Sequence, residues 1–298
     1  MSLVLKDVSK SYSGKKVVDN ISFKLDKPGV FGLLGTNGAG KTTTIRMILG
    51  ILKKETGEIT WNGKTVDRKT VNFGYLPEER GVYPKTIIMN QLMYFAELKG
   101  MNKQDAEKEI KDWAKKLKVE EYLYQTAEKL SKGNQQKIQF MTAVIHNPEL
   151  IVLDEPFSGL DPVNTEIIKN IIIELVRNGK YVIMSAHQMA TIEEFCSDIL
   201  ILNKGKTVLQ GNLKEIRAAY PANRLKVETE ENILRYIKDC NLEVENEFDN
   251  NYVLKLQNEN NAHELLKMLV TNNIKVNKFE IMKPTLNDIF VEKVGGGE

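Results

Sequence analysis

Gly35-Thr36-Asn37-Gly38-Ala39-Gly40-Lys41-Thr42 is the stretch that decides the fold of this chain. It follows the apolar run Val30–Leu34, and the residues from Thr43 to Leu49 have helical character. Glycines in such a loop let successive backbone N–H groups point at phosphate oxygens, and the helix N-terminus adds unpaired donors. The arrangement predicts a nucleotide site in which Lys41 reaches the β- and γ-phosphates and Thr42 ligates Mg²⁺. The alternative is a glycine-rich turn with a solvated lysine.

Composition narrows the class of protein. The chain has 298 residues, 42% of them hydrophobic, which is enough for a large core or for two domains. A net charge of +2 gives no electrostatic argument for a nucleic-acid partner. Cys196 and Cys240 lie in different regions and form neither a metal-ligand spacing nor a disulfide framework. No secretory segment is visible, and no apolar run approaches the roughly 20 residues that span a bilayer, so we expect a soluble chain.

The pattern of apolar residues predicts an α/β fold up to about residue 220. Leu150–Leu153 and Tyr181–Met184 are continuous apolar runs, as in parallel strands that are buried on both faces. Hairpin signals at Asn62-Gly63 and around Lys204-Gly205 indicate antiparallel β-structure. Helical periodicity in residues 86–147 indicates a helical insertion. We therefore expect a mixed sheet core with an antiparallel β subdomain, and the nucleotide at the carboxyl ends of the strands.

After Pro221 the order of the predicted strands and helices changes. Between residues 225 and 281 the order of predicted elements is β-α-β-β-α-β, followed by a short helix over Leu286–Lys293. This order fits a small α+β module of the ferredoxin-like type. The sequence thus predicts two domains, 1–220 and 221–298, with a flexible tail from Gly295.

Candidate catalytic groups follow the two buried strands. Asp154 and Glu155 come directly after Leu150–Leu153, and His187 comes shortly after the second strand. Asp154 suits Mg²⁺ coordination, Glu155 suits activation of a water, and His187 suits contact with the γ-phosphate. The alternatives are a solvated acidic pair and a structural histidine.

A further motif completes an ordered set. Leu130–Lys137 opens a helix with Ser131 as a plausible N-cap. The whole set resembles the ATP-binding subunits of ABC transporters. Gly35–Thr42 looks like Walker A, Leu130–Lys137 is similar to the LSGGQ signature, and Leu150–Glu155 looks like Walker B with the catalytic glutamate. Ser158–Asp161 resembles the D-loop, and His187 the switch histidine.

The resemblance implies a fold, a reaction and partners. It implies a P-loop ATPase that binds ATP and Mg²⁺ and works as a dimer, most simply a homodimer. Each ATP then contacts the Walker A of one subunit and, in trans, Ser131 and Gly133 of the other, while Tyr12 stacks on adenine. It also implies a separate transmembrane permease subunit, no nucleic-acid partner, and a place at the inner face of the cell membrane through that permease. Catalysis is implied for Glu155, His187 and Lys41.

Two departures from the family pattern stand out. Lys132 replaces the first glycine of the signature, and Asn134 replaces its glutamine. Glu78 stands where the family usually has a glutamine that contacts Mg²⁺ or water; a surface ion pair is the alternative role. The run Tyr75–Gly81 and the terminal stretch Pro284–Phe290 resemble a bacterial exporter subgroup that includes sodium-efflux and antibiotic-resistance systems.

Three other functions stay open at this point. A soluble ABC ATPase acting on ribosomes or DNA usually carries two cassettes or long coiled coils, and this sequence has neither. A nucleotide sensor without hydrolysis fits the altered signature but not Glu155 and His187. A GTPase-like switch lacks a guanine-reading motif, and Tyr12 suits adenine better.

Overall fold

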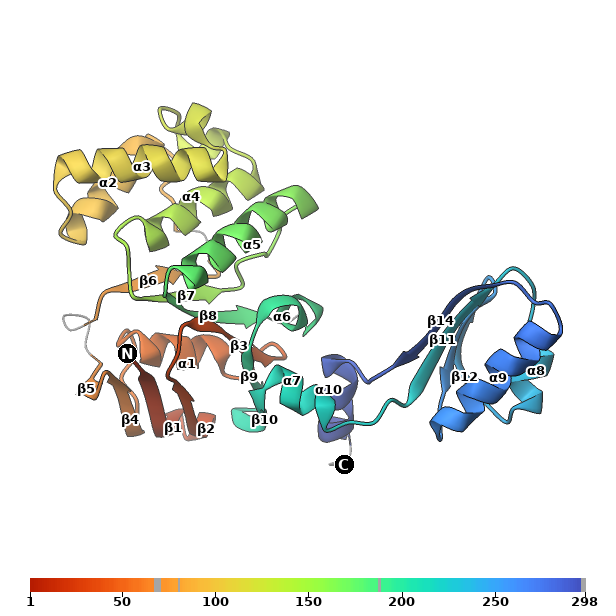
Figure 1. Ribbon diagram of the computed structural model, residues 1–298. Helices are drawn as coiled ribbons and strands as arrows, with labels where there is room; N and C mark the ends of the chain where they lie inside the picture. Colours follow the sequence, from red (N-terminus) through yellow and green to blue (C-terminus); the bar gives the residue numbers. More distant parts are fainter. Residues whose placement is uncertain (67–70, 80, 187–188, 296–298) are drawn as a thin grey trace. The chain divides into compact units, whose positions relative to one another are not determined.

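The protein divides into two compact units, Met1–Gly211 and Asn212–Glu298. The computed structural model describes residues 1–66, 71–79, 81–186 and 189–295 (Figure 1). The sequence placed the boundary after residue 220, whereas the structure groups the short helix α7 (Leu213–Ala218) with the second unit. The described residues include no helix with the length and apolarity that a membrane crossing needs.

A six-stranded sheet is the centre of the first unit. Its strand order is β10-β9-β3-β8-β7-β6. The bounds are β3 (Gly29–Gly35), β6 (Phe73–Leu76), β7 (Leu150–Asp154), β8 (Tyr181–Ala186), β9 (Asp198–Asn203) and β10 (Lys206–Asn212). The strands β6, β7, β8, β3 and β9 run parallel, so their carboxyl ends meet at one edge. Every residue of β7 and β8 is buried, which confirms the prediction from their apolar runs.

A second, antiparallel sheet carries the N-terminal strands. Its order is β2-β1-β4-β5, with β1 (Leu3–Tyr12), β2 (Lys15–Leu25), β4 (Thr56–Trp61) and β5 (Lys64–Thr65). The hairpin at Asn62-Gly63 joins β4 to β5 as predicted. Asn20 takes a left-handed φ of 56° and shifts the register, but β2 continues through it.

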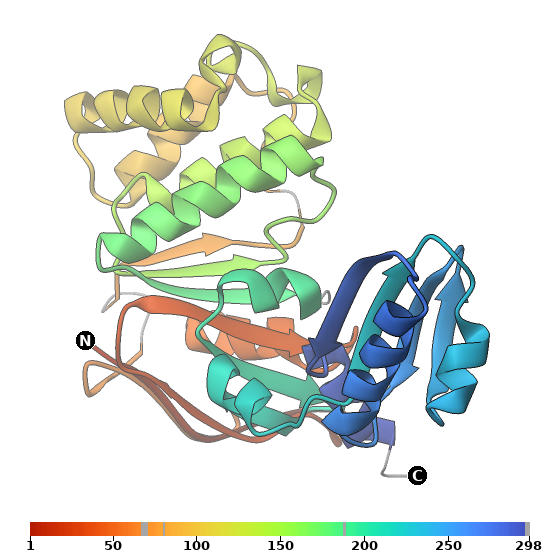
Figure 2. The same ribbon diagram turned by 45° about the vertical axis from the view of Figure 1, so that its right-hand side comes forward.

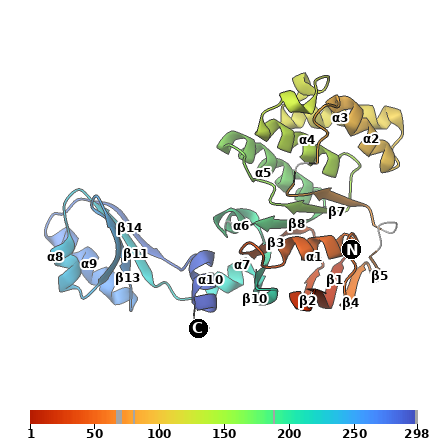
Figure 3. The same cartoon turned by 180° about the vertical axis from the view of Figure 1, so that it is seen from behind.

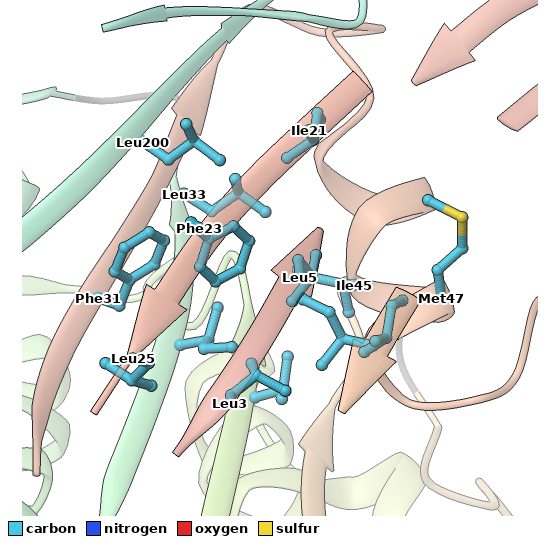
Figure 4. Packing of buried hydrophobic residues seen from close by; sticks show 14 of the residues in the cluster. Leu3, Leu5, Ile21, Phe23, Leu25, Phe31, Leu33, Ile45, Met47 and Leu200 are labelled. Carbon is cyan, nitrogen blue, oxygen red and sulfur yellow. The ribbon is translucent and has the colours of Figure 1, made fainter. Parts of the chain in front are cut away.

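The main hydrophobic core lies between the two sheets. Helix α1 (Lys41–Ile48) occupies this space (Figure 3). Side chains from both sheets and from α1 meet there, including Leu5, Phe23, Leu33 and Ile45, and the rings of Phe23 and Phe31 stack at 4.6 Å (Figure 4). Burial of this apolar surface fixes the strand before α1 and the helix itself, and so fixes the loop between them.

Helices lie on the other side of the central sheet. They are α2 (Ile88–Leu98), α3 (Lys103–Leu117), α4 (Lys132–Val144), α5 (Pro162–Arg177) and α6 (Met189–Phe195), with 3₁₀ turns at Glu120–Tyr122 and Ala127–Lys129. Helices α4, α5 and α6 contact the strands, whereas α2 and α3 pack on α4 (Figure 1). Helices α2, α3 and α4 form the predicted helical insertion. Helix α4 lies so close to β6 that a Cβ at Gly74 would be 2.0 Å from the Ala143 carbonyl oxygen. No side chain larger than hydrogen fits there.

The second unit contains a four-stranded antiparallel sheet. Its order is β12-β13-β11-β14, with α8 (Leu234–Asp239) and α9 (Glu259–Thr271) on one face (Figure 2). The strands are β11 (Arg224–Thr229), β12 (Glu243–Phe248), β13 (Asn251–Lys255) and β14 (Val276–Met282), and α10 (Leu286–Gly295) follows. This is the ferredoxin-like order that the sequence predicted. Its core is apolar and includes Val227, Tyr252, Leu254 and Leu265.

Candidate functional site

The loop between β3 and α1 is shaped by two glycines. Gly35 has a φ of 147°, and a Cβ there would lie 2.4 Å from the Leu202 carbonyl oxygen. Gly40 has a φ of 103°, and a Cβ there would lie 2.6 Å from the Val17 carbonyl oxygen. Both positions combine a backbone conformation that other residues rarely adopt with a close approach to neighbouring backbone. The loop is therefore tightly seated on β9 and β2.

Lys41 is the first residue of α1, and its side chain is almost fully buried. Nζ donates to the Gly35 carbonyl at 2.8 Å and to the Thr36 carbonyl at 3.4 Å, and it lies 3.9 Å from Glu155 Oε1. A buried ammonium is tolerated only when it is paired and hydrogen-bonded. These contacts hold the positive charge directly against the loop, where a phosphate would be drawn.

A serine on the neighbouring strand β8 holds the Asp154 carboxylate at the end of β7 and the backbone of Glu155, the next residue. Ser185 Oγ donates to Asp154 Oδ1 and accepts a 3.0 Å hydrogen bond from the Glu155 backbone N–H. Glu155 has a φ of 52°, a left-handed conformation that is uncommon outside glycine. Strained backbone of this kind persists where neighbouring contacts enforce it, and it clusters at functional sites.

These groups share one cavity of about 260 Å³. Its lining residues are Val17, Asn37, Gly38, Ala39, Gly40, Lys41, Thr42, Thr43, Glu78, Asp154 and Glu155. The structure thus brings the glycine-rich loop, both carboxylates and Glu78 together, although they are far apart in the sequence. The lining of the cavity combines a positive charge and backbone donors with carboxylates, which suits a phosphate group that is bound together with a cation.

A buried carboxylate oxygen of Asp154 indicates that a cation fits in this cavity. Asp154 is 1% exposed, and its Oδ2 is buried with no hydrogen-bond partner. An unpaired carboxylate oxygen in such a place is costly unless something positive meets it. No group of three or more His, Cys, Asp or Glu side chains in the described part of the chain makes a metal site by itself. The residues therefore fit a cation that takes most of its oxygen ligands from phosphate.

The signature residues lie elsewhere on the same unit. Ser131 caps α4 by accepting from the Asn134 backbone N–H at 3.3 Å, as predicted. Gly133 is buried, and a Cβ there would lie 3.0 Å from Asn164 Nδ2. Neither residue lines the cavity.

Of the two remaining candidate residues, Tyr12 and His187, the structure describes only Tyr12. Tyr12 ends β1 with 47% of its surface exposed, and Lys10 Nζ lies 5.5 Å from its ring centre. It does not line the cavity, and its flat ring is open to a partner. His187 lies outside the described residues, so its predicted role stays a prediction.

Sequence reasoning missed several polar groups around the site. Ser185 was visible as a hydroxyl at the end of an otherwise apolar strand, but its role depends on which strand lies beside it. Gln136 donates to the Pro156 carbonyl at 3.2 Å, and Gln139 donates to the carbonyls of Pro77 and Glu79. These contacts link residues between 20 and 62 positions apart, and no local pattern marks them.

Comparison with known protein families agrees with this arrangement. A family model described as ABC transporter matches residues 18–158. A second model, described as the C-terminal domain of DrrA1-3-like ATP-binding proteins, matches residues 211–294. The two matches fall on the two compact units.

Individual relatives extend over the whole chain. An uncharacterised ABC transporter ATP-binding protein of Bacillus subtilis, YhaQ, is 44% identical over 295 residues, covering 98% of each chain. The bacitracin transport ATP-binding protein BcrA of Bacillus licheniformis is 30% identical over 318 residues, covering 100% of this chain and 99% of the relative. A solved structure of an ATP-binding subunit of an ABC transporter superposes with a TM-score of 0.68 at 30% identity, covering 74% of this chain and 93% of the other. The chain therefore belongs to the ATP-binding subunits of ABC transporters, ATPases that hydrolyse ATP to power transport.

Proposed function

We propose that two copies of this chain close around two Mg²⁺–ATP complexes and thereby drive a separate membrane-spanning subunit in export. One observation carries the proposal. The cavity is lined by the glycine-rich loop, Lys41, Thr42 and both carboxylates, while Ser131 and Gly133 lie outside it. A second chain that presents its own Ser131 would complete the site, and the same contact would complete the second site by symmetry.

The residues of the cavity divide the work between them. Lys41 and the backbone N–H groups of Gly38–Thr43 bind the phosphates, and the open surface of Tyr12 suits stacking on adenine. Thr42 and Asp154 hold the cation, whose charge offsets the negative charge of the phosphates. Glu155 accepts a proton from the attacking water, and its strained backbone aims the carboxylate at the cavity.

Glu78 extends this set. It lines the same cavity but is exposed, as expected for a group that meets solvent until the nucleotide is bound. We assign it the position of the family's glutamine, as an oxygen ligand to the cation or its water. A carboxylate in this position would raise the negative charge around the cation and so strengthen its binding.

A second cavity on the first unit fits the membrane partner. It has a volume of about 510 Å³ and is mainly apolar. Its lining includes Ile51, Phe73, Tyr75, Phe95, Leu98 and His146. Leu98 is 64% exposed and Tyr94, on the same helix, is 55% exposed, so apolar surface continues outward from the cavity. Such a groove suits the apolar face of a short cytoplasmic helix of the permease.

An exposed leucine tests this docking site. Leu98→Glu puts a charge on the groove and should release the chain from membranes of its host, while the purified variant still hydrolyses ATP. Val270→Glu is the matched control, because Val270 is 63% exposed but lies on the second unit. Sedimentation of host membranes with each variant measures the effect. Equal membrane binding by Leu98→Glu and wild type would rule out the groove.

We propose that residues 221–298, which make up most of the second unit, form an accessory domain with no part in catalysis. Its core is apolar, and its charged groups lie on the surface in pairs such as Lys255–Glu243 and Lys278–Glu280. Export as the direction of transport is supported by the relatives: BcrA is named for bacitracin transport, and the C-terminal model is named for DrrA-like proteins.

A further inference from the structure

A buried glutamine on α4 holds the loop that carries Glu78. Gln139 is 2% exposed, and its Nε2 donates to the Pro77 carbonyl at 3.1 Å and to the Glu79 carbonyl at 2.9 Å. These two carbonyls belong to the residues on either side of Glu78. One amide group therefore fixes the backbone on both flanks of the carboxylate that lines the nucleotide cavity.

Only the NH₂ group of the Gln139 amide is hydrogen-bonded. Gln139 Oε1 is buried and has no hydrogen-bond partner. A leucine of similar size would avoid that unpaired oxygen, so packing alone does not explain a glutamine here. The orientation is also fixed, because an oxygen in the place of Nε2 would face two carbonyl oxygens. What this position supplies is a pair of N–H donors to the loop.

The base of this contact is rigid. Gly74 of β6 lies against the Ala143 carbonyl with no room for a Cβ. His146, just after α4, contacts the Phe73 carbonyl through Nε2 at 3.0 Å. Helix α4 thus has one fixed seat on β6, and Gln139 reaches from that seat to the loop that follows β6. The same residue also lines the apolar groove, so it lies between the groove and the nucleotide cavity.

We propose that Gln139 is a positioning residue for Glu78: its two donated hydrogen bonds hold the loop so that the Glu78 carboxylate reaches the nucleotide cavity. This inference rests on the role proposed above for Glu78. It differs from a purely structural role because it acts on one carboxylate and leaves the phosphate-binding loop unchanged. Gln139 itself is not among the residues that line the nucleotide cavity.

The test starts with Gln139→Leu in the full-length protein. The kcat for ATP hydrolysis should fall roughly tenfold or more, because small displacements of catalytic groups have large effects on rate. The dissociation constant for ATP should stay unchanged. Gln139→Met, which keeps the length of the side chain but loses both donors and adds no charge, should show the same defect and covers the case in which the leucine variant folds poorly.

Gln91 provides a matched control. It is also 2% exposed, and it accepts from the Tyr83 backbone N–H at 3.0 Å and donates to the Thr86 carbonyl at 3.1 Å. It holds the far end of the same loop, away from Glu78. Gln91→Leu should therefore lower kcat by less than about threefold, as expected for a buried polar contact outside the site.

A double-variant cycle decides the mechanism. When Glu78 is already alanine, adding Gln139→Leu should lower kcat no further, because both changes remove the same contribution. A further loss in the Glu78→Ala background, a weaker ATP affinity, or wild-type kcat in the Gln139 variants would each overturn the inference. If Glu78→Ala alone leaves kcat unchanged, both the role of Glu78 and this inference fail, whereas wild-type kcat in the Gln139 variants with a slow Glu78→Ala refutes only the inference.

Discussion

The two units of the molecule differ in what they bury. The first unit buries charged and amide side chains, among them Lys41, Gln139, Asp154 and Glu155, along with His146. In the second unit, the buried side chains among the described residues are aliphatic, aromatic or cysteine, with Thr229 as the exception. Buried polar groups cost stability unless they are paired, so a unit that keeps many of them keeps them for another reason.

The location of these groups gives the reason. In the first unit, Lys41, Asp154 and Glu155 line the nucleotide cavity, and Gln139 holds the loop that carries Glu78. In the second unit the charged pairs lie on the surface, and a sealed apolar core supplies the stability. We infer that the first unit keeps buried polar groups, at a cost in stability, because they serve the nucleotide site. The second unit is stabilised by its apolar core. Three predictions test this difference, in order of expected effect.

The largest effect should come from the general base. Glu155→Gln keeps the size of the side chain but cannot accept a proton at neutral pH, so turnover should fall by roughly 100-fold or more. ATP binding should persist, because Lys41 and the loop are untouched. Turnover and nucleotide binding of the purified protein measure both. Glu166→Gln, an exposed change on α5, is the control. Normal turnover in Glu155→Gln would remove Glu155 from its role.

The second effect should be loss of stability without loss of the site. Leu254 is fully buried in the core of the second unit, and Leu254→Ala should destabilise that unit by about 2–5 kcal/mol. ATP affinity should hold, since the site lies in the first unit. Leu33→Ala removes an equally buried leucine from β3, next to the glycine-rich loop, and should weaken both stability and ATP binding. Equal loss of ATP binding in the two variants would contradict the separation.

The smallest effect should be a pH dependence confined to the first unit. Burial lowers the pKa of His146 from 6.5 to about 4, so the folded state keeps this ring neutral. Below pH 6.5 the unfolded chain takes up a proton that the folded chain refuses until about pH 4. The contribution of the neutral His146 ring to the free energy of unfolding is therefore complete above pH 6.5 and is lost as the pH falls toward 4.

Urea unfolding of the first unit measures this contribution. Between about pH 7.5 and about pH 5 the wild type should lose about 2 kcal/mol more than His146→Gln, which has no proton to take up. His263 in the second unit is exposed, and His263→Gln should leave the pH dependence of the wild type unchanged. An identical pH dependence in the wild type and in His146→Gln would show that the ring is not kept neutral by burial.

The sequence predicted those parts of the fold that depend on residues close together in the chain. The glycine-rich loop, the two buried strands and the cap at Ser131 each depend on neighbouring residues, and all appear in the structure. The ferredoxin-like order of the second unit could also be predicted, because turns such as Asp249-Asn250 separate its strands and helices. Helix α6 was missed.

The site could be predicted only in part, because its supporting contacts join residues that are far apart in the sequence. Residues of Walker A and Walker B type could be named from the sequence, but the contacts that hold them could not. Ser185 reaches Asp154 only because β8 lies beside β7, and Gln139 reaches the Glu78 loop only because α4 lies on β6. Such pairings depend on the tertiary fold, which one sequence does not reveal residue by residue.

The central claim is that two chains share each nucleotide, and mixing two inactive variants tests it most directly. Lys41→Ala disables the loop, and Ser131→Asp keeps the cap of α4 but sets a carboxylate against the γ-phosphate. Alone, each variant should hydrolyse almost no ATP. Mixed in equal amounts with Mg²⁺ and ATP, they should recover activity of up to about a quarter of the wild type, because random pairing gives half mixed dimers with one intact site each. A mixture as inactive as its components, or full activity in Ser131→Asp alone, would contradict the account.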